Sequence, residues 1–396
     1  MDHRIGTISR VCLSLAAVLV WRAGPVHAGG VPESAHSRSL DMRPEFLDYT
    51  SLVFQYPHRA GFGDSEAFAF SVSGNELGVG VVASPGDQGF FILAQRNPSF
   101  FLTGATFLQA GWGGGWESIQ FGLAFRGAHS ETGFAQAAMS PGSPPSEFAA
   151  IQRERQLEGS AGLGLRGDRM DLDLAVDLIH EDAEEDARTM SLGDTLLVHL
   201  EDDDDLSWGV SGRIALRIGE SAEVVAVGGW AGPERDLAGT RTDASGTTDE
   251  TEKRESDRWS GGLAVAFSTR HVDWVAVSAH VRVEEASTAR VSSGARRTDS
   301  FRLETGSLTV SVRHEVWRDL TVFAGGSARY RVYDTESRTQ DGGGSESIHT
   351  QRTESLDESF AWGASYRWRN FEFNVAADTT LDIENLFLVL DARLFL

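Results

Sequence analysis

The sequence predicts an all-β protein: a closed, antiparallel, up-and-down transmembrane β-barrel of 14–16 strands with a short N-terminal plug or periplasmic tail. Three observations support this prediction. The terminal residues 386–396, from Leu386 to Leu396, alternate between a purely apolar face and a mixed face. Many earlier segments have the same pattern, and short connections alternate with long ones. A strand between lipid and a polar lumen is two-faced in this way.

Residues 1–28 have the features of a secretory signal peptide. Arg4 and Arg10 are basic, residues 11–21 are apolar, and Ala28 is a small residue suited to cleavage. No run of 18 apolar residues follows, so we expect no transmembrane helix in the mature chain. We therefore divide the chain into a signal peptide (1–28), a plug or tail (29–64) and a barrel (65–396).

Composition excludes several kinds of chemistry. The only cysteine, Cys12, lies in the predicted signal peptide, so the mature chain would have neither disulfides nor thiolate ligands. The net charge of −23 argues against nucleic-acid binding. Forty-three glycines and only 10 prolines fit many strands joined by tight turns, and nothing in the sequence calls for a cofactor.

Residues 29–64 are irregular because Pro32, Pro44 and Pro57 interrupt them. We expect a short helical turn at 43–47 and a short strand at 49–55. A plug and a disordered tail remain alternatives, the second mainly for the residues before Asp48.

From residue 66 the chain alternates between apolar and polar side chains over sixteen segments. Residues 169–179 are the clearest example, because Met170, Leu172 and Leu174 share one face while Asp171 and Asp173 share the other. Fourteen strands are the alternative if residues 66–84 belong to the plug. The predicted strands are 66–74, 77–84, 88–95, 103–111, 117–130, 158–165, 169–179, 207–218, 221–230, 259–269, 272–284, 301–316, 320–333, 359–368, 371–378 and 386–396.

From residue 158 onward, connections of two to four residues alternate with long polar ones. Outer-membrane barrels have short periplasmic turns and long extracellular loops, whereas a soluble sandwich has no reason to sort its loops by length. A sheet that closes on itself also pairs every backbone group within the hydrocarbon. We predict a Gly-rich turn at 113–115 and long loops at 131–157, 180–205, 231–257, 286–299 and 334–356.

Aromatic residues gather near the predicted strand ends, where interfacial girdles lie in membrane barrels. Packing in the core of a soluble sandwich is the alternative explanation for them. The residues are Trp259, Trp317, Tyr330, Tyr366, Trp368 and Phe371.

These features resemble bacterial outer-membrane β-barrel proteins. Residues 386–396 look like the terminal signal that the barrel assembly machinery recognises, although Phe395 is penultimate and the family usually ends on an aromatic. Arg43-Pro44-Glu45-Phe46-Leu47 keeps the proline and leucine of the Asn-Pro-Ala-Gly-Leu hatch motif of long-chain fatty-acid transporters. That likeness implies 14 strands and hydrophobic ligands passing through a plugged lumen. The wider one implies a Gram-negative outer membrane, with lipid and lipopolysaccharide as neighbours.

Charged residues occupy the parity that we assign to the lumen. They could set pore size and ion preference, or they could fill and rigidify a narrow barrel. The candidates are Arg213, Arg217, Arg282, Glu284, Arg313, Glu315, Arg329, Arg331, Arg367, Asp391 and Arg393.

The acidic stretch 180–205 could bind Ca²⁺, which prefers several oxygen ligands. The spacing Asp-x-Asp-x-Asp-Gly does not occur, and a run of adjacent acids is more often a solvated loop. The candidate ligands are Glu201, Asp202, Asp203, Asp204 and Asp205.

The sequence contains none of the common hydrolase or phosphate-binding motifs, so we expect no enzyme. His129 and His180, at predicted outer strand ends, are the residues to test for an outer-membrane hydrolase. The expected function is passage of small or hydrophobic solutes by facilitated diffusion. A sealed structural or adhesive barrel that acts through its acidic loops is the alternative.

Overall fold

The computed structural model describes most of the chain from residue 52 to residue 395. Within these residues no helix is long and apolar enough to span a membrane. The predicted signal peptide and the hatch-like residues 43–47 lie outside the described residues. The described ranges are 52–62, 67–73, 76–83, 88–98, 104–116, 118–138, 146–191, 194–202, 205–219, 221–232, 234–243, 246–268, 272–292, 295–340, 346–380 and 386–395.

One antiparallel sheet contains all the described strands, and a short helical segment precedes it. The strands are β1 (Ala67–Ser73), β2 (Glu76–Ala83), β3 (Gln88–Pro98), β4 (Gly104–Trp116), β5 (Ile119–Ala138), β6 (Ser146–Arg166), β7 (Met170–Ser191), β8 (Asp194–Asp202), β9 (Asp205–Ile218), β10 (Ala222–Gly232), β11 (Glu234–Asp243), β12 (Gly246–Phe267), β13 (Trp274–Ser292), β14 (Ala295–Trp317), β15 (Leu320–Gln340), β16 (Glu346–Trp368), β17 (Phe371–Thr380) and β18 (Leu386–Phe395).

The sheet closes on itself because β18 pairs with β17 on one side and with β1 on the other. The closing register joins Ala67 to Phe395 and Ser73 to Val389. The eighteen described strands occupy sixteen positions round the barrel, because β8 and β9 both pair along β7, and β10 and β11 both pair along β12. The predicted even count of sixteen is therefore confirmed, and residues 67–83 belong to the barrel wall.

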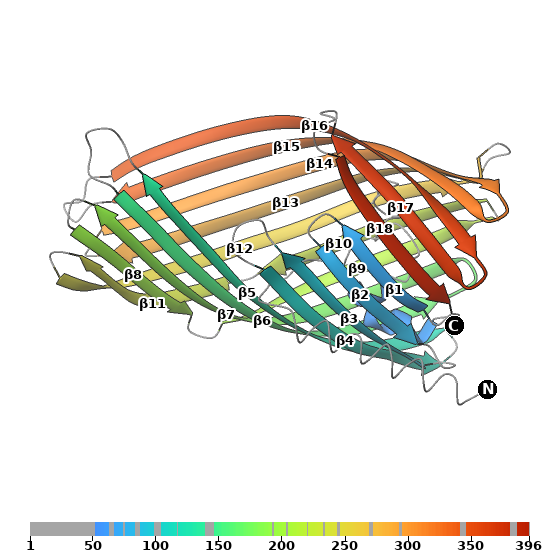
Figure 1. Cartoon of the computed structure of the whole chain (residues 1–396), viewed down its shortest axis with the longest axis horizontal. Helices are drawn as coiled ribbons and strands as arrows, with labels where there is room; N and C mark the ends of the chain where they lie inside the picture. The colour runs from blue at the N-terminus through green and yellow to red at the C-terminus, as the bar shows by residue number, and fades with distance from the viewer. Residues whose placement is uncertain are drawn as a thin grey trace.

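The five long loops predicted from the sequence are wrong, because most of their residues continue the strands. β5 and β6 stay paired from Ile119–Leu165 to Ala138–Ser146, and β14 and β16 each contain 23 residues. Figure 1 shows strands such as β12–β16 running far past β1–β4 and β17–β18 at one end. Beyond the membrane both faces of a strand meet water, so polar side chains on both faces are compatible with pairing.

The two faces of the sheet differ as the alternation predicts. On β5, Phe121, Leu123 and Phe125 are exposed on the outer face, while Gln120 and Ala124 are buried on the inner face. On β13 the apolar outer positions span nine residues, from Val275 to Val283, the length that crosses a membrane when tilted. A continuous exposed apolar surface of this kind marks contact with lipid.

Exposed aromatic side chains border the apolar outer surface at two levels, as predicted for interfacial girdles. At the short-turn end they are Trp317, Tyr366, Trp368 and Phe371, and at the far end they are Trp208, Trp259 and Tyr330.

A helical segment lies against the inner face of β3–β6. It consists of helix α3 (Leu52–Gln55) and the 3₁₀-helix η2 (Pro57–Phe62), and we call residues 52–62 the plug segment. The strand predicted at 49–55 is therefore wrong from Leu52 onward. Tyr56 N donates to Leu52 O at 2.7 Å, and Pro57 opens η2 at a position where its missing N–H is not needed.

Glycines form the part of the wall on which the plug segment rests. The turn predicted at 113–115 is wrong: these glycines lie inside β4, and the chain turns after Trp116. A Cβ on Gly113 would lie 2.5 Å from the carbonyl oxygen of Pro57, and a Cβ on Gly122 would overlap the backbone nitrogen of His58. Only glycine lets the two backbones approach so closely. We call Gly89, Gly113, Gly122 and Gly162 the glycine seat.

Candidate functional site

The carboxylate of Asp173 joins the plug segment to the barrel wall. It accepts hydrogen bonds from His58 Nε2 at 2.9 Å, from Arg59 Nε at 3.0 Å and Nη2 at 2.7 Å, and from Arg213 Nη1 at 3.3 Å. The side chains of His58, Asp173 and Arg213 are at most 1% exposed. We call these four residues the latch.

Strand register explains the wall side of the latch. Asp173 on β7 lies directly opposite Arg213 on β9, and Arg217 reaches Asp171 at 2.5 Å. Asp171 and Asp173, two residues apart on β7, thus point to the same inner face as Arg213 and Arg217 of the neighbouring strand β9. Buried charges are tolerated only when they are paired and hydrogen-bonded, and both arginines satisfy this condition.

His58 supplies a buried imidazole from the plug segment. Burial lowers the pKa of His58 below its ordinary value of 6.5, while the hydrogen bond and charge of Asp173 act in the opposite direction. The neutral ring fits the site because Arg59 and Arg213 already bring positive charge to Asp173. The plug segment is therefore held to Asp173 by one ion pair, from Arg59, and by the hydrogen bond from the neutral His58 ring, while Arg213 of the wall provides a second counter-charge.

A second polar network continues round the inner wall from β5 to β7. Arg126 contacts Glu158 at 3.2 Å, and the Ser160 hydroxyl lies 3.3 Å from Glu158 and donates to Asp177 at 2.6 Å. The Ser160 hydroxyl thus links the Arg126–Glu158 ion pair to the carboxylate of Asp177 on the next strand.

Apolar side chains fill the inner wall elsewhere near the plug segment. Val53 and Ala60 pack with Phe91 and Leu93, so the plug segment is seated in direct contact. A separate apolar cluster lies on the inner faces of β9–β15 and consists of Ala215, Val225, Ala264, Ala266, Ala276 and Phe323. The interior thus combines paired charges with apolar surface.

The predicted lumen residues fall into different settings. Arg213 and Arg217 belong to the network around the plug segment. Other candidates pair with nearby acids: Arg282 with Glu284 at 2.5 Å and Arg331 with Asp357 at 3.3 Å. Near the short turns, Arg313 lies 5.8 Å from the Trp274 ring, the Glu315 backbone N–H donates to Asp273, and Arg367 is exposed. Arg329 is exposed, and the side chains of Asp391 and Arg393 lie outside the described part.

Glu201 and Asp202 end β8, and Asp205 begins β9, whereas residues 203–204 lie outside the described residues. The side chains of the run are not among the described ones either, so its predicted Ca²⁺ site stays a prediction. His129 lies on β5 and His180 lies on β7, with β6 between the two strands. By strand alternation His129 is on the same outer face as Phe125, and His180 is on the same outer face as Leu178.

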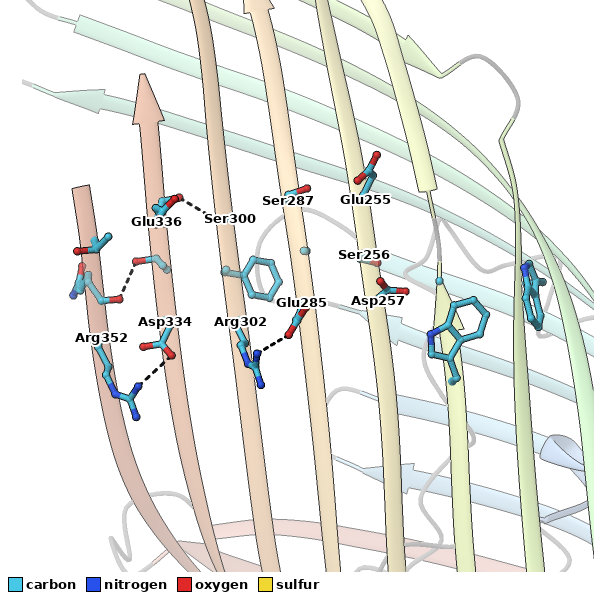
Figure 2. Close-up of a pocket in the computed structure, with 18 residues that line it drawn as sticks. Glu255, Ser256, Asp257, Glu285, Ser287, Ser300, Arg302, Asp334, Glu336 and Arg352 are labelled. Carbon is cyan, nitrogen blue, oxygen red and sulfur yellow. Dashed lines mark hydrogen bonds and ion pairs between the residues drawn. The ribbon is translucent and has the colours of Figure 1, made fainter. Parts of the chain in front are cut away.

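Beyond the aromatic level, a groove of about 1080 Å³ crosses the outer face of β12–β16. Charged residues lie directly opposite one another across neighbouring strands (Figure 2). Arg302 contacts Glu285 at 2.9 Å, and Arg352 contacts Asp334 at 3.4 Å. We call this row the charged row; its members are Asp257, Glu285, Arg302, Asp334 and Arg352.

Sequence reasoning missed the plug half of the latch. The alternation of Asp171 and Asp173 was visible and pointed inward, and Arg213 was among the predicted lumen residues. His58 and Arg59 gave no comparable signal, because they are separated from Asp173 by 115 and 114 residues and lie outside any alternating segment.

Known proteins resemble this chain in structure rather than in sequence. No protein-family model matches, and no curated protein matches. The deltaS2S3 mutant of the TodX monoaromatic hydrocarbon channel superposes with a TM-score of 0.51 at 13% identity, covering 91% of this chain and 97% of that one. The Pseudomonas putida toluene transporter TodX gives 0.47 at 12% identity (94% and 98%), and the Ralstonia pickettii toluene transporter TbuX gives 0.44 at 11% (92% and 97%). The fold is that of bacterial outer-membrane β-barrels, as the sequence predicts.

Proposed function

We propose that this protein lets small hydrophobic solutes cross the outer membrane of a Gram-negative bacterium by facilitated diffusion, with the plug segment controlling the path. The observation that carries the proposal is the plug segment itself, seated on glycines and held by the latch. The plug segment contributes two side chains, His58 and Arg59, to one buried carboxylate that the wall residue Arg213 also contacts, so its attachment depends on a single group. Displacement of the plug segment would open the interior.

The outer surface supports the membrane setting. The apolar surface would face lipid tails, and the charged row just beyond the aromatic level would lie among lipopolysaccharide headgroups. In the closing strand, residues 386–395 would carry the assembly signal, because pairing of β18 with β1 completes the ring.

Hydrophobic solutes suit this interior better than ions. Beside the plug segment the inner charges of Arg126 and Glu158 form an ion pair, and apolar clusters occupy both the plug side and the side of β9–β15. An ion pore would instead need a continuous wet path with unpaired charges of one sign. The name of the TodX channel, a monoaromatic hydrocarbon channel, is consistent with this solute class.

A reversible cross-link tests the control by the plug segment. A Cβ on Gly162 would lie 2.6 Å from His58 Nδ1, so His58→Cys with Gly162→Cys brings two thiols together where the ring was. Toluene entry into proteoliposomes should be fast with the reduced double variant, since the latch is weakened, and slow after oxidation. Gly162→Cys alone should not respond to oxidation. Equal entry rates for the oxidised and reduced forms would refute plug control.

A sealed barrel that acts through its long polar hairpins is the second candidate, favoured by the charged outer surface that β12–β16 present beyond the aromatic level. Planar-bilayer recording and solute entry separate the two candidates, because a sealed barrel gives neither conductance nor solute entry even when the latch is removed.

We further propose that the chain is not an enzyme. His129→Ala and His180→Ala should leave any hydrolysis of lipids or peptides by the purified protein at background level.

A further inference from the structure

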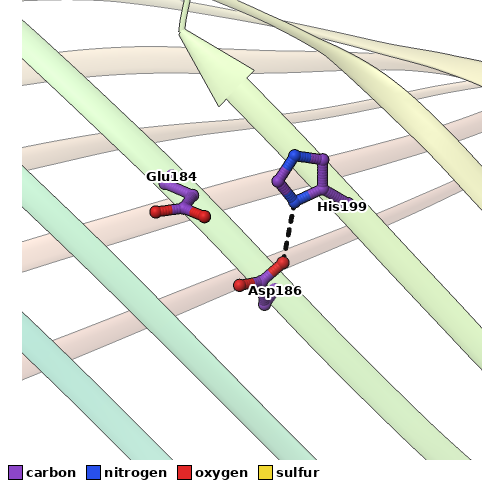
Figure 3. A group of neighbouring side chains, drawn as sticks. All are labelled: Glu184, Asp186 and His199. Atoms are coloured by element: carbon purple, nitrogen blue, oxygen red, sulfur yellow. Dashed lines mark hydrogen bonds and ion pairs between the residues drawn. The ribbon is translucent and has the colours of Figure 1, made fainter.

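The hairpin of β7 and β8 gathers three possible metal ligands outside the apolar surface. Glu184 and Asp186 come from β7, and His199 comes from β8 (Figure 3). The pairing of β7 with β9 ends at Glu181, so the group lies past that point, towards the hairpin tip at Ser191 and Asp194. It shares no residue with the latch.

Strand geometry fixes the three side chains on one face. Residues 184 and 186 are two apart on β7 and therefore point the same way, and His199 lies directly opposite Asp186. The Asp186 carboxylate is 2.7 Å from His199 Nδ1. One ligand atom from each residue lies within 4.8 Å of the other two. Ligands bound to one ion at about 2.0–2.2 Å are at most about 4.4 Å apart, so small side-chain movements would suffice.

We propose that Glu184, Asp186 and His199 bind a divalent transition-metal ion of the Zn²⁺ type, with water completing its coordination. One imidazole with two carboxylates suits such an ion, whereas Ca²⁺ takes six to eight oxygen ligands. The site differs from the predicted Ca²⁺ site in the run 201–205, although Glu201 occupies the register position opposite Glu184.

The ion would join β7 to β8, which also pairs with β11. A link between Asp186 and His199 would hold the tip of the β7–β8 hairpin. The side chains of His199 and Asp186 are 48% and 43% exposed, so an ion can reach them from the medium.

Calorimetric titration of the folded full-length protein in detergent with Zn²⁺ tests the proposal, and Co²⁺ absorption reports the ligand set. We expect one saturable site. His199→Ala and Asp186→Asn should each weaken Zn²⁺ binding at least about tenfold, since even partners outside the ligand shell cost that much. His349→Ala, an exposed histidine of β16 opposite Ser337, should bind as the wild type does. Heat-modifiable gel mobility verifies that each variant is folded.

Three results would overturn the proposal. The first is that the wild type shows no saturable Zn²⁺ binding. The second is that His199→Ala binds Zn²⁺ as tightly as the wild type does. The third is that the control His349→Ala loses as much Zn²⁺ affinity as His199→Ala does. A protein that binds Ca²⁺ but not Zn²⁺, and still does so as His199→Ala, would also contradict the proposal. That result would assign cation binding to the acidic run 201–205 instead. The outcome does not depend on whether the barrel passes solutes.

Discussion

Asp173 is the residue on which the docking of the plug segment depends most. Asp173→Asn removes the charge shared by Arg59 and Arg213 and leaves the buried Arg213 without its counter-charge. Breaking a buried ion pair costs about 3–5 kcal/mol, so we expect the plug segment to leave the wall. A spin label at Gln55→Cys should become mobile and toluene entry should rise. Asp182→Asn, whose 3.8 Å partner Arg155 is exposed, is the control. An immobile label in Asp173→Asn would show that the latch is dispensable.

The glycine seat makes a steric prediction that is independent of charge. Gly122→Ala places a methyl group on the backbone nitrogen of His58, so the plug segment must shift while the strand stays intact. The matched control is Gly306→Ala, because a Cβ there meets no atom within 4 Å. We expect faster solute entry only for Gly122→Ala, with both proteins folded by gel mobility. Identical entry rates would mean that the seat does not position the plug segment.

His58 gives docking a pH dependence whose sign follows from its pKa. The docked ring has a pKa below 6.5, so the undocked form binds a proton more readily once the pH falls below that value. Docking is therefore fully present above about pH 6.5 and weakens as the pH decreases. The mobility of a spin label at Gln55→Cys should rise on acidification. His58→Gln should flatten the response, and an unchanged slope in that variant would assign the titration to another group.

The residues of the latch show where sequence reasoning stops. Alternation identified the inner face of β7 and placed Arg213 and Arg217 inside, because both facts depend only on neighbours in the strand. Contact of His58 with Asp173 depends on how the plug segment folds back across β3–β6, which no local pattern records. The glycines of β4 resemble a turn in the sequence for the same reason, since their contact with the plug segment appears only in the folded chain.

At the scale of elements, apolar alternation found the membrane part of the strands but not their full length. Predicted and observed starts agree within a few residues at the short turns, as at Leu320 and Phe371. Past the aromatic level the apolar alternation ends although the hydrogen-bonded ladder continues, so the sequence of the extensions predicts loops where the structure has strands. Backbone pairing sustains them, and their side chains add cross-strand ion pairs such as Arg302 with Glu285.

The extensions should accordingly tolerate loss of single charges. Arg302→Ala removes contacts to Glu285 at 2.9 Å and to Glu304 at 2.6 Å, but its side chain is 50% exposed. Exposed pairs contribute about 0–1 kcal/mol, so we expect the free energy of unfolding in urea to fall by less than about 1 kcal/mol. The loss should shrink further in high salt because exposed charges are screened. A loss above about 2 kcal/mol would mean that the charged row, not the backbone ladder, holds the extensions.

For the whole molecule, closure and membrane insertion have the same cause. Hydrocarbon offers no partner for backbone groups, so sixteen strand positions must form a ring, and β18 must reach β1. The even count and the two-faced pattern were predictable because every strand obeys the same constraint. The side-chain contacts of the latch and of the β7–β8 hairpin do not follow from this shared constraint, because they depend on particular residues that the fold brings together.

Depth in the membrane gives the sharpest test of this arrangement. Val277 and Val291 lie on the outer face of β13, at 38% and 42% exposed, but only Val277 lies within the apolar stretch from Val275 to Val283. Arginine near the middle of the bilayer costs about 2–4 kcal/mol in a barrel and about 0–1 kcal/mol near the interface. Val277→Arg should therefore reduce the free energy of folding into lipid vesicles by about 2 kcal/mol or more, while Val291→Arg should change it little. Equal effects of the two variants in vesicles would place the lipid boundary elsewhere on the strand and undermine the assignment of the outer face.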